Sequence, residues 1–124
     1  MTFLPENYEG FWTLGAKIVR QGVCLHSGDY SEVTLLPSFK EGFYLSFGDN
    51  PDNVIKLSST QIRNSPLCTT LDFGFTKLAT VEHLFAALIG CGLTHVHIQV
   101  SGQEIPLLDG SALSWVEGIK AVGL

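Results

Sequence analysis

Apolar and polar residues alternate along the first two-thirds of the chain, which is the pattern of strands that bury one face. The clearest run is Phe43, Leu45 and Phe47. The alternation predicts short strands within residues 13–25, 31–36, 43–47, 54–57 and 67–73. Glycine, aspartate, asparagine and proline are concentrated in residues 48–53, which predicts a loop between two of these strands.

The apolar spacing changes to that of a helix in the last third of the chain. Apolar residues recur there at i, i+3, i+4 and i+7, and they are Val81, Leu84, Phe85 and Leu88. Thr80 is predicted to cap this helix, because its hydroxyl can accept a hydrogen bond from an N–H of the first turn. The helix is predicted to end near Gly90 or Gly92, where glycine readily takes the left-handed conformation that closes a helix.

A further strand and a second helix complete the predicted fold. Apolar and polar residues alternate again over residues 95–100, and a tight connector follows at 106–111. Apolar residues then recur at helical spacing from Leu113 to Ile119, with Asp109 or Ser111 as the predicted cap. Strands followed by two helices indicate an α+β fold. We expect a single domain over residues 1–124 with a mainly antiparallel sheet and both helices packed on one face.

Charge and composition exclude several classes of function. The net charge is −5 and no run of lysine or arginine occurs, so nucleic-acid binding is not expected. The longest strongly apolar segment, residues 84–93, is too short to cross a bilayer, and no transmembrane segment or signal peptide is expected. Cys24, Cys68 and Cys91 are odd in number and lack C-x-x-C spacing, which favours a reducing, cytoplasmic compartment.

The chain is poor in charged residues for its size. They make up 15% of the sequence, against roughly 25% in an average soluble domain. Two interpretations are open. Part of the surface is covered by a partner or a second domain, or the surface is an ordinary one rich in serine, threonine and glycine.

Glu82 and His83 are the first candidates for chemistry, because they lie side by side where the first helix is predicted to begin. Neighbouring helical residues point about 100° apart, so the two side chains reach one cavity from different directions. The zinc-protease signature needs a second histidine four residues later, and that position is Ala87. The structural alternative is a glutamate favoured by the helix dipole beside a packed or solvated histidine.

Other candidates carry weaker signals. His95 and His97 lie two apart on one face of a predicted strand and could share a metal, although exposure on an edge strand is the simpler interpretation. Cys68 and Cys91 have no partner at a diagnostic spacing, and His26 lies in a turn-like segment. The chain contains no G-x-S-x-G elbow, P-loop or G-x-G-x-x-G, so serine hydrolase and nucleotide-binding functions are not supported.

Four segments together resemble one known family. They are G-V-C-L-H-S-G at 22–28, L-C-T-T-L at 67–71, T-V-E-H-L at 80–84 and E-I-P-L-L-D-G-S-A at 104–112. In this order they are similar to the N-terminal half of UDP-3-O-acyl-N-acetylglucosamine deacetylases, the zinc amidases of lipid A biosynthesis. The similarity extends from about Thr13 to Leu124.

The resemblance implies a site that this sequence only partly contains. The family has two similar halves packed face to face in a β-α-α-β sandwich, with the active site between them. It implies that Glu82 is the general base and that His83 is one of three protein ligands to Zn²⁺. The other ligands lie in an H-K-x-x-D segment of the second half, which this sequence lacks. His26, Leu67 and Cys68 resemble positions that contact the acylated UDP-sugar substrate.

Three hypotheses follow from these observations. The first is the N-terminal domain of such a deacetylase, inactive without its second half because a single histidine is a poor zinc site. The second is a non-catalytic binding or scaffold module that retains the fold. The third is a homodimer in which a second copy substitutes for the missing half.

Overall fold

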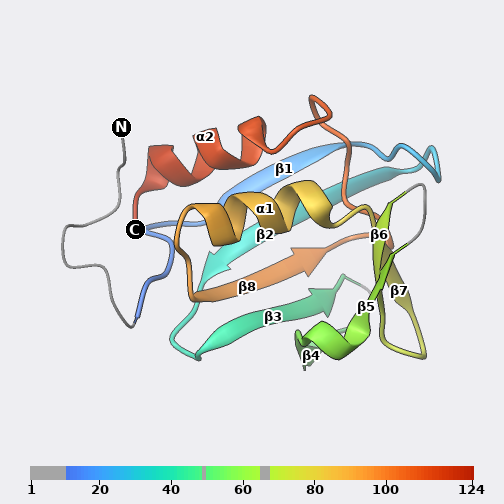
Figure 1. The fold of residues 1–124 in the computed structure, drawn as a ribbon, viewed down its shortest axis with the longest axis horizontal. Helices are drawn as coiled ribbons and strands as arrows, with labels where there is room; N and C mark the ends of the chain where they lie inside the picture. The colour runs from blue at the N-terminus through green and yellow to red at the C-terminus, as the bar shows by residue number, and fades with distance from the viewer. Residues whose placement is uncertain (1–10, 49, 65–67) are drawn as a thin grey trace.

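The computed structural model describes residues 11–48, 50–64 and 68–124, and its main element is a five-stranded sheet (Figure 1). Its strands are β1 (Ile18–Val23), β2 (Tyr30–Pro37), β3 (Gly42–Phe47), β4 (Asn50–Lys56) and β8 (His95–Val100). They are ordered β1-β2-β8-β3-β4, so the last strand in the sequence lies at the centre of the sheet. Every pairing is antiparallel except the one between β3 and β8.

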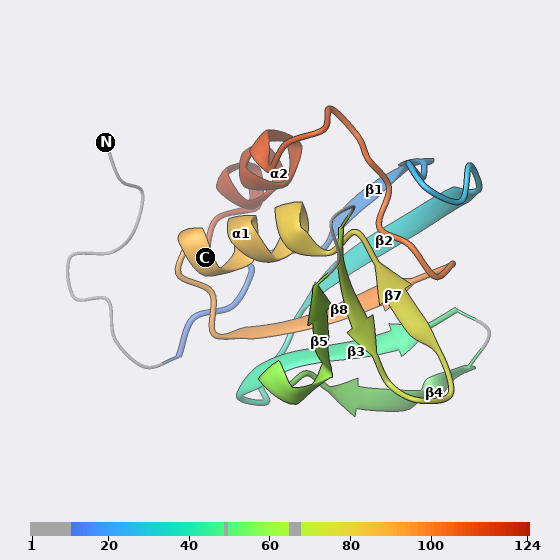
Figure 2. The same cartoon turned by 45° about the vertical axis from the view of Figure 1, so that its right-hand side comes forward.

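A second, smaller sheet stands at one end of the large one, beside the start of the first helix (Figure 2). It contains β5 (Ile62–Asn64), β6 (Thr69–Asp72) and β7 (Lys77–Ala79), all antiparallel, and follows a single 3-10 turn, η1 (Ser59–Gln61). Ala79 also bridges to Glu104, which comes just after β8. This bridge ties the small sheet to the segment that leaves the large one.

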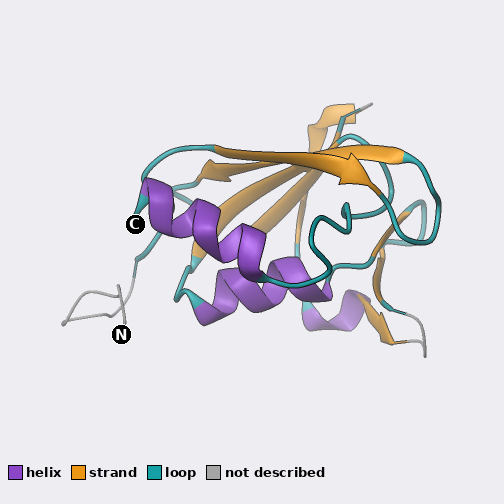
Figure 3. Ribbon diagram, turned by 90° about the horizontal axis from the view of Figure 1, so that it is seen from above, coloured by secondary structure: helices purple, strands orange, loops and turns teal. Residues whose placement is uncertain are grey.

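Both helices cover the same face of the large sheet (Figure 3). They are α1 (Glu82–Gly90) and α2 (Leu113–Val122). The core lies between them and the sheet, and its fully buried members include Leu35, Leu45, Ile98, Leu84, Leu88, Trp115 and Ile119. Burial of each such side chain contributes about 1.5–3 kcal/mol, so this layer holds the helices in place.

The structure confirms the α+β class and the mainly antiparallel sheet. The helix expected from Val81 is α1, and Gly92 takes the left-handed backbone just after it, with φ of 81°. The prediction of a loop over residues 48–53 is wrong in its extent. Strand β4 already begins at Asn50, where it pairs with Phe47 of β3. The strands β5 and β7 were not predicted.

The expected helix caps are also corrected. The N-cap of α1 is Val81 rather than Thr80, and no side chain caps it. The N-cap of α2 is Ala112, although the Ser111 hydroxyl accepts a hydrogen bond from the Leu113 amide at 3.1 Å. Within the parts of the chain that the structure describes, neither helix has the length and apolar character needed to span a membrane.

Gly15 allows the beginning and the end of the domain to meet. Its amide donates a hydrogen bond to the Gly123 carbonyl at 2.8 Å, and a Cβ at this position would lie 2.3 Å from the Val122 carbonyl oxygen. We expect Gly15→Ala to lower the free energy of unfolding by about 1–3 kcal/mol, because rigid backbone must move to accommodate the methyl group. Urea unfolding followed by far-UV circular dichroism measures the change.

Gly90→Ala is the matched control. A Cβ on Gly90 meets no atom within 4 Å, and the residue closes α1, where alanine has the higher helix propensity. This variant should be as stable as the parent or slightly more stable. Equal destabilisation by the two substitutions would contradict the close approach at Gly15.

Candidate active site at the start of helix α1

The first turn of α1 is anchored to strand β6. The Val81 amide donates to the Thr69 carbonyl at 3.2 Å, and the Thr69 amide donates back to Oε2 of Glu82 at 3.1 Å. This pair of contacts fixes one oxygen of the Glu82 carboxylate at the end of β6. The unsatisfied N–H groups of the helix start carry partial positive charge and also favour a carboxylate here.

His83 follows Glu82 at the edge of the core rather than inside it. Both side chains are half-buried, whereas the next residue, Leu84, is fully buried against the sheet. Cys68, which precedes Thr69, is half-buried as well, and its Sγ lies 3.7 Å from the Thr70 hydroxyl. The start of α1 therefore presents a carboxylate and an imidazole at an accessible boundary.

An apolar cavity of about 290 Å³ opens beside Glu82. Its lining residues come from the large sheet, the small sheet and α1, and they are Phe43, Leu57, Ser58, Ile62, Thr69, Leu71, Val81, Glu82, Phe85 and Ile89. Ile89 is 66% exposed and Ile62 is 43% exposed. The candidate site thus borders an apolar surface that the described residues leave exposed.

A buried carboxylate, Glu104, lies behind the start of α1. It is 4% exposed and accepts three hydrogen bonds: from the His26 amide at 3.0 Å, the Ser27 amide at 2.9 Å and the Thr80 hydroxyl at 3.0 Å. Burial raises the pKa of this carboxyl, but the three donors outweigh burial, so the pKa of Glu104 lies below its ordinary value. The group is a carboxylate at neutral pH.

Thr80 is the residue through which Glu104 reaches the helix. Its backbone is left-handed, with φ of 60°, and its side chain is 3% exposed. A β-branched residue in this conformation is strained, so surrounding contacts must hold it there. The hydroxyl that was expected to cap α1 is instead donated to Glu104, which explains why the predicted cap is absent.

The described residues expected to contact substrate lie in two separate segments, the β1–β2 turn and the position just before β6. His26 is exposed on the turn between β1 and β2, and Glu104 links this turn to Thr80. Cys68 lies beside the Thr69 that anchors Glu82. Leu67 lies outside the described residues. Glu104 was part of a quoted motif but was given no role, and the signal that could have found it is a lone acid within the apolar segment 104–108.

Among the described residues, no group of three or more histidine, cysteine, aspartate or glutamate side chains could hold a metal ion. His83 can therefore contribute to a metal site only together with ligands from elsewhere. Its imidazole nitrogen is a normal zinc ligand, and the adjacent Glu82 carboxylate is a normal proton acceptor beside such a site. The residue types fit one part of a zinc centre.

The interpretation of His95 and His97 as exposed residues of an edge strand is wrong. Strand β8 lies at the centre of the sheet, and His95 is 6% exposed, with Nδ1 2.7 Å from the Thr94 hydroxyl and its ring 4.0 Å from that of Phe11. His97 Nε2 lies 2.9 Å from the Ser46 hydroxyl. Burial, assisted by Lys40, lowers the pKa of His97. Both histidines have structural contacts.

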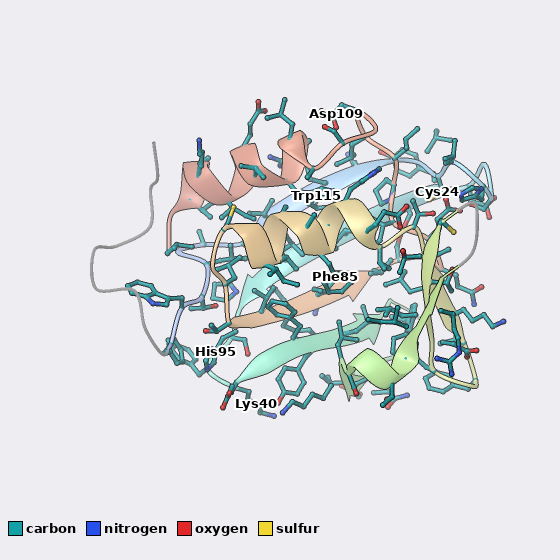
Figure 4. The ribbon with its side chains drawn as sticks, in the orientation of Figure 1. Cys24, Lys40, Phe85, His95, Asp109 and Trp115 are labelled. Carbon is teal, nitrogen blue, oxygen red and sulfur yellow. The ribbon has the colours of Figure 1, made fainter. Side chains whose placement is uncertain are left out.

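The cysteines are thiols, and two of them are poorly placed for nucleophilic chemistry. Burial raises the pKa of both Cys24 and Cys91, which keeps them protonated at neutral pH. Figure 4 shows Cys24 at the end of the molecule where α1 begins, far from Lys40 and His95 at the opposite end. Its Sγ donates weakly to the Glu104 carbonyl at 3.5 Å.

Comparison with known proteins connects this geometry to one family. The family profile of UDP-3-O-acyl N-acetylglycosamine deacetylase matches residues 12–124. Relatives named UDP-3-O-acyl-N-acetylglucosamine deacetylase are 42% identical over 114 residues in Trichormus variabilis, 44% identical over 114 residues in a Nostoc species, and 36% identical over 115 residues in a Geobacter species.

Each of these alignments covers 90% of this chain but only 37–41% of the relative. The chain thus spans about two fifths of the length of the curated relatives it matches. The match includes the turn at His26, the start of α1 and the segment after β8. On this evidence, the chain belongs to the UDP-3-O-acyl N-acetylglycosamine deacetylase family.

Proposed function

We propose that this chain forms the N-terminal part of a zinc-dependent deacetylase that removes the N-acetyl group from UDP-3-O-acyl-N-acetylglucosamine in lipid A biosynthesis. Glu82 is the general base and His83 is one zinc ligand. The remaining ligands belong to the part of the protein that the relatives contain and this chain does not. The observation that carries the proposal is the anchored Glu82 beside His83 at the start of α1, within a chain of this family.

The chemistry divides between the metal and the chain. A zinc ion with an open coordination position supplies Lewis acidity, which lowers the pKa of a water molecule and polarises a carbonyl group. The Thr69 amide holds Oε2 of Glu82 and so orients the carboxylate. A carboxylate has several lone pairs, so one bond to Thr69 leaves capacity to take a proton from water as it attacks the amide carbonyl. The products are acetate and a free sugar amine.

The exposed apolar surface supports the proposal that a further part of the protein packs against this chain and completes the site. The surface of the cavity beside Glu82 is almost entirely apolar, although Ser58, Thr69 and Glu82 also line it, and Ile89 on α1 is exposed. Apolar patches of this kind usually mark interaction surfaces. Three thiols without disulfide bonds support a reducing compartment, and we infer a cytoplasmic location.

A chimera tests the function of these residues directly. This chain replaces the aligned 114 residues of the Trichormus variabilis relative, and release of acetate from the UDP-sugar is measured. The chimera should be active, and Glu82→Gln should lower its kcat by roughly 10²- to 10⁴-fold, because the general base is lost while the shape is kept. Glu41→Gln, an exposed acid between β2 and β3, is the matched control and should leave kcat unchanged.

Full activity in the Glu82→Gln chimera would favour the scaffold hypothesis over the enzyme. An active chimera in which Glu41→Gln was as damaging as Glu82→Gln would show that the loss is not specific to the site. Circular dichroism on each variant separates loss of chemistry from loss of fold.

Zinc binding gives a second, independent prediction. The chimera should retain about one zinc per chain after dialysis, and His83→Ala should abolish retention, because zinc in proteins takes three or four ligands. The 124-residue chain alone should retain little zinc and show no turnover. Metal content is measured by atomic emission, with His97→Asn as the control that removes a histidine from strand β8.

Undiminished zinc content in the His83→Ala chimera would remove His83 from the metal site. Robust deacetylation by the isolated chain would contradict the requirement for a second half. Light scattering on the isolated chain would then show whether two copies supply the site.

A further inference from the structure

Three segments that are distant in the sequence meet at the carboxylate of Glu104. Oε2 accepts from the His26 amide and the Thr80 hydroxyl, and Oε1 accepts from the Ser27 amide. The segments are the β1–β2 turn, the residue pair before α1 and the chain that leaves β8. Within the described residues, this carboxylate is satisfied by hydrogen-bond donors of these segments.

The backbone of Glu104 is fixed independently of its side chain. The Ala79 amide donates to the Gln103 carbonyl at 2.9 Å, and the Ile105 amide donates to the Ala79 carbonyl at 3.0 Å. These two bonds hold Glu104 alongside Ala79, directly before Thr80. The carboxylate therefore extends from a fixed backbone toward the two segments it holds, the turn and the helix start.

Two backbone amides of the His26 turn are held by this carboxylate. The turn's own hydrogen bonds, Cys24 amide to Asp29 carbonyl at 2.8 Å and Gly28 amide to Cys24 carbonyl at 3.0 Å, close it upon itself. Contacts from Cys24 Sγ to the Glu104 carbonyl at 3.5 Å and from the Leu107 amide to the Val23 carbonyl at 3.2 Å hold its base against the segment after β8. The bonds from His26 and Ser27 to the Glu104 side chain connect the rest of the turn to the start of α1, since Glu104 also holds Thr80, two residues before Glu82.

We propose that Glu104 is a positioning residue, which holds the His26 turn at a fixed place relative to Glu82 and His83. This inference rests on the proposed function for its catalytic consequence, but the contact itself is independent of it. Glu104 touches no reacting atom and acts through His26 and Thr80. Its loss should misplace one wall of the site while the helix and sheet remain folded.

Glutamine at this position has the same shape but the wrong hydrogen-bond character. Glutamine replaces one of the two carboxylate oxygens with an NH₂ group, which donates. That NH₂ group would then face an N–H or O–H donor instead of accepting from it. Glu104→Gln thus keeps part of the contact and leaves at least one donor without an acceptor. Thr80→Val removes the hydroxyl alone, and Thr80→Ser keeps it.

Hydrogen exchange on the 124-residue chain tests the contact without any activity. The amides of His26 and Ser27 should be protected in the parent, and at least the amide left facing the glutamine NH₂ should exchange at least tenfold faster in Glu104→Gln, because its acceptor is lost. Amides of strand β8, such as that of Ile98, should keep their protection. Unchanged protection at His26 and Ser27 would overturn the proposal. Equal loss throughout the chain would reduce Glu104 to a general structural role.

The pH dependence of stability provides a matched measurement. Because the folded-state pKa of Glu104 is lowered, its stabilising contribution is complete above the ordinary glutamate pKa of about 4.3 and is lost as the pH falls through the folded value. Cys24 and Asp29 line the same pocket as Glu104, and His26 donates its backbone amide to it. The stability difference between parent and Glu104→Gln should be constant from pH 5 to about 7 and should shrink below this range. A stability difference between parent and Glu104→Gln that grew as the pH fell would contradict the lowered pKa of Glu104.

Kinetics of the chimera separate positioning from structure. Glu104→Gln should lower kcat/KM by roughly 10- to 100-fold, as expected when a site wall is misplaced by about 1 Å. Added to His26→Ala, it should cost little more, because both substitutions remove the same wall. Thr80→Ser should lose less than Thr80→Val.

Additive losses in the double variant would show that Glu104 does not act through His26 and would overturn the positioning role. If the parent chimera were inactive, the proposed function would fail, and hydrogen exchange would still decide whether Glu104 holds the turn. Glu41→Gln again serves as the control acid in every arm.

Discussion

Burial of one face of α1 against the large sheet is the constraint on which the rest of the structure depends. Leu84 and Leu88 are fully buried under the helix, which fixes its axis and thereby the direction of its first turn. Glu82 and His83 project from that turn at the boundary of the core. A carboxylate and an imidazole placed there keep a defined position without being enclosed, as a site shared with further protein requires.

The helix start is also held from two sides by hydrogen bonds, in addition to the apolar packing of Val81 and Leu84. Thr69 of the small sheet holds Glu82, and Glu104 holds Thr80 in its left-handed conformation. A buried carboxylate is costly unless donors satisfy it, and these donors come from separate parts of the chain. Because the buried charge of Glu104 needs all of these donors, it favours the arrangement in which the turn and the helix start lie together.

Local patterns predicted the elements whose signals are local. The alternation at Phe43, Leu45 and Phe47 corresponds to β3, and the helical spacing from Val81 corresponds to α1. Strands β5 and β7, of three residues each, are too short for a period to register and form because β6 pairs on both sides. His95 followed the polar phase of its strand, but its burial comes from Phe11 and Thr94 and from the central place of β8, which no local pattern contains.

The candidate site divides in the same way. Glu82 and His83 were predicted as site residues from adjacency at a helix start and from resemblance to a family. The family is confirmed, and the roles of the two residues stay predictions. The role of Thr80 was mispredicted because its hydroxyl is used by a residue 24 positions later. Glu104 is marked in the sequence only as a lone acid within the apolar segment 104–108, and its contacts come from the donors that the fold brings to it.

The central claim is that His83 is a ligand of a metal centre completed by protein outside this chain. The most direct measurement is a crystal structure of the active chimera with zinc located by anomalous scattering. We expect a zinc peak about 2.0–2.1 Å from a ring nitrogen of His83, with the Glu82 carboxylate beside it. A fully active chimera whose zinc lies away from His83 would contradict the account.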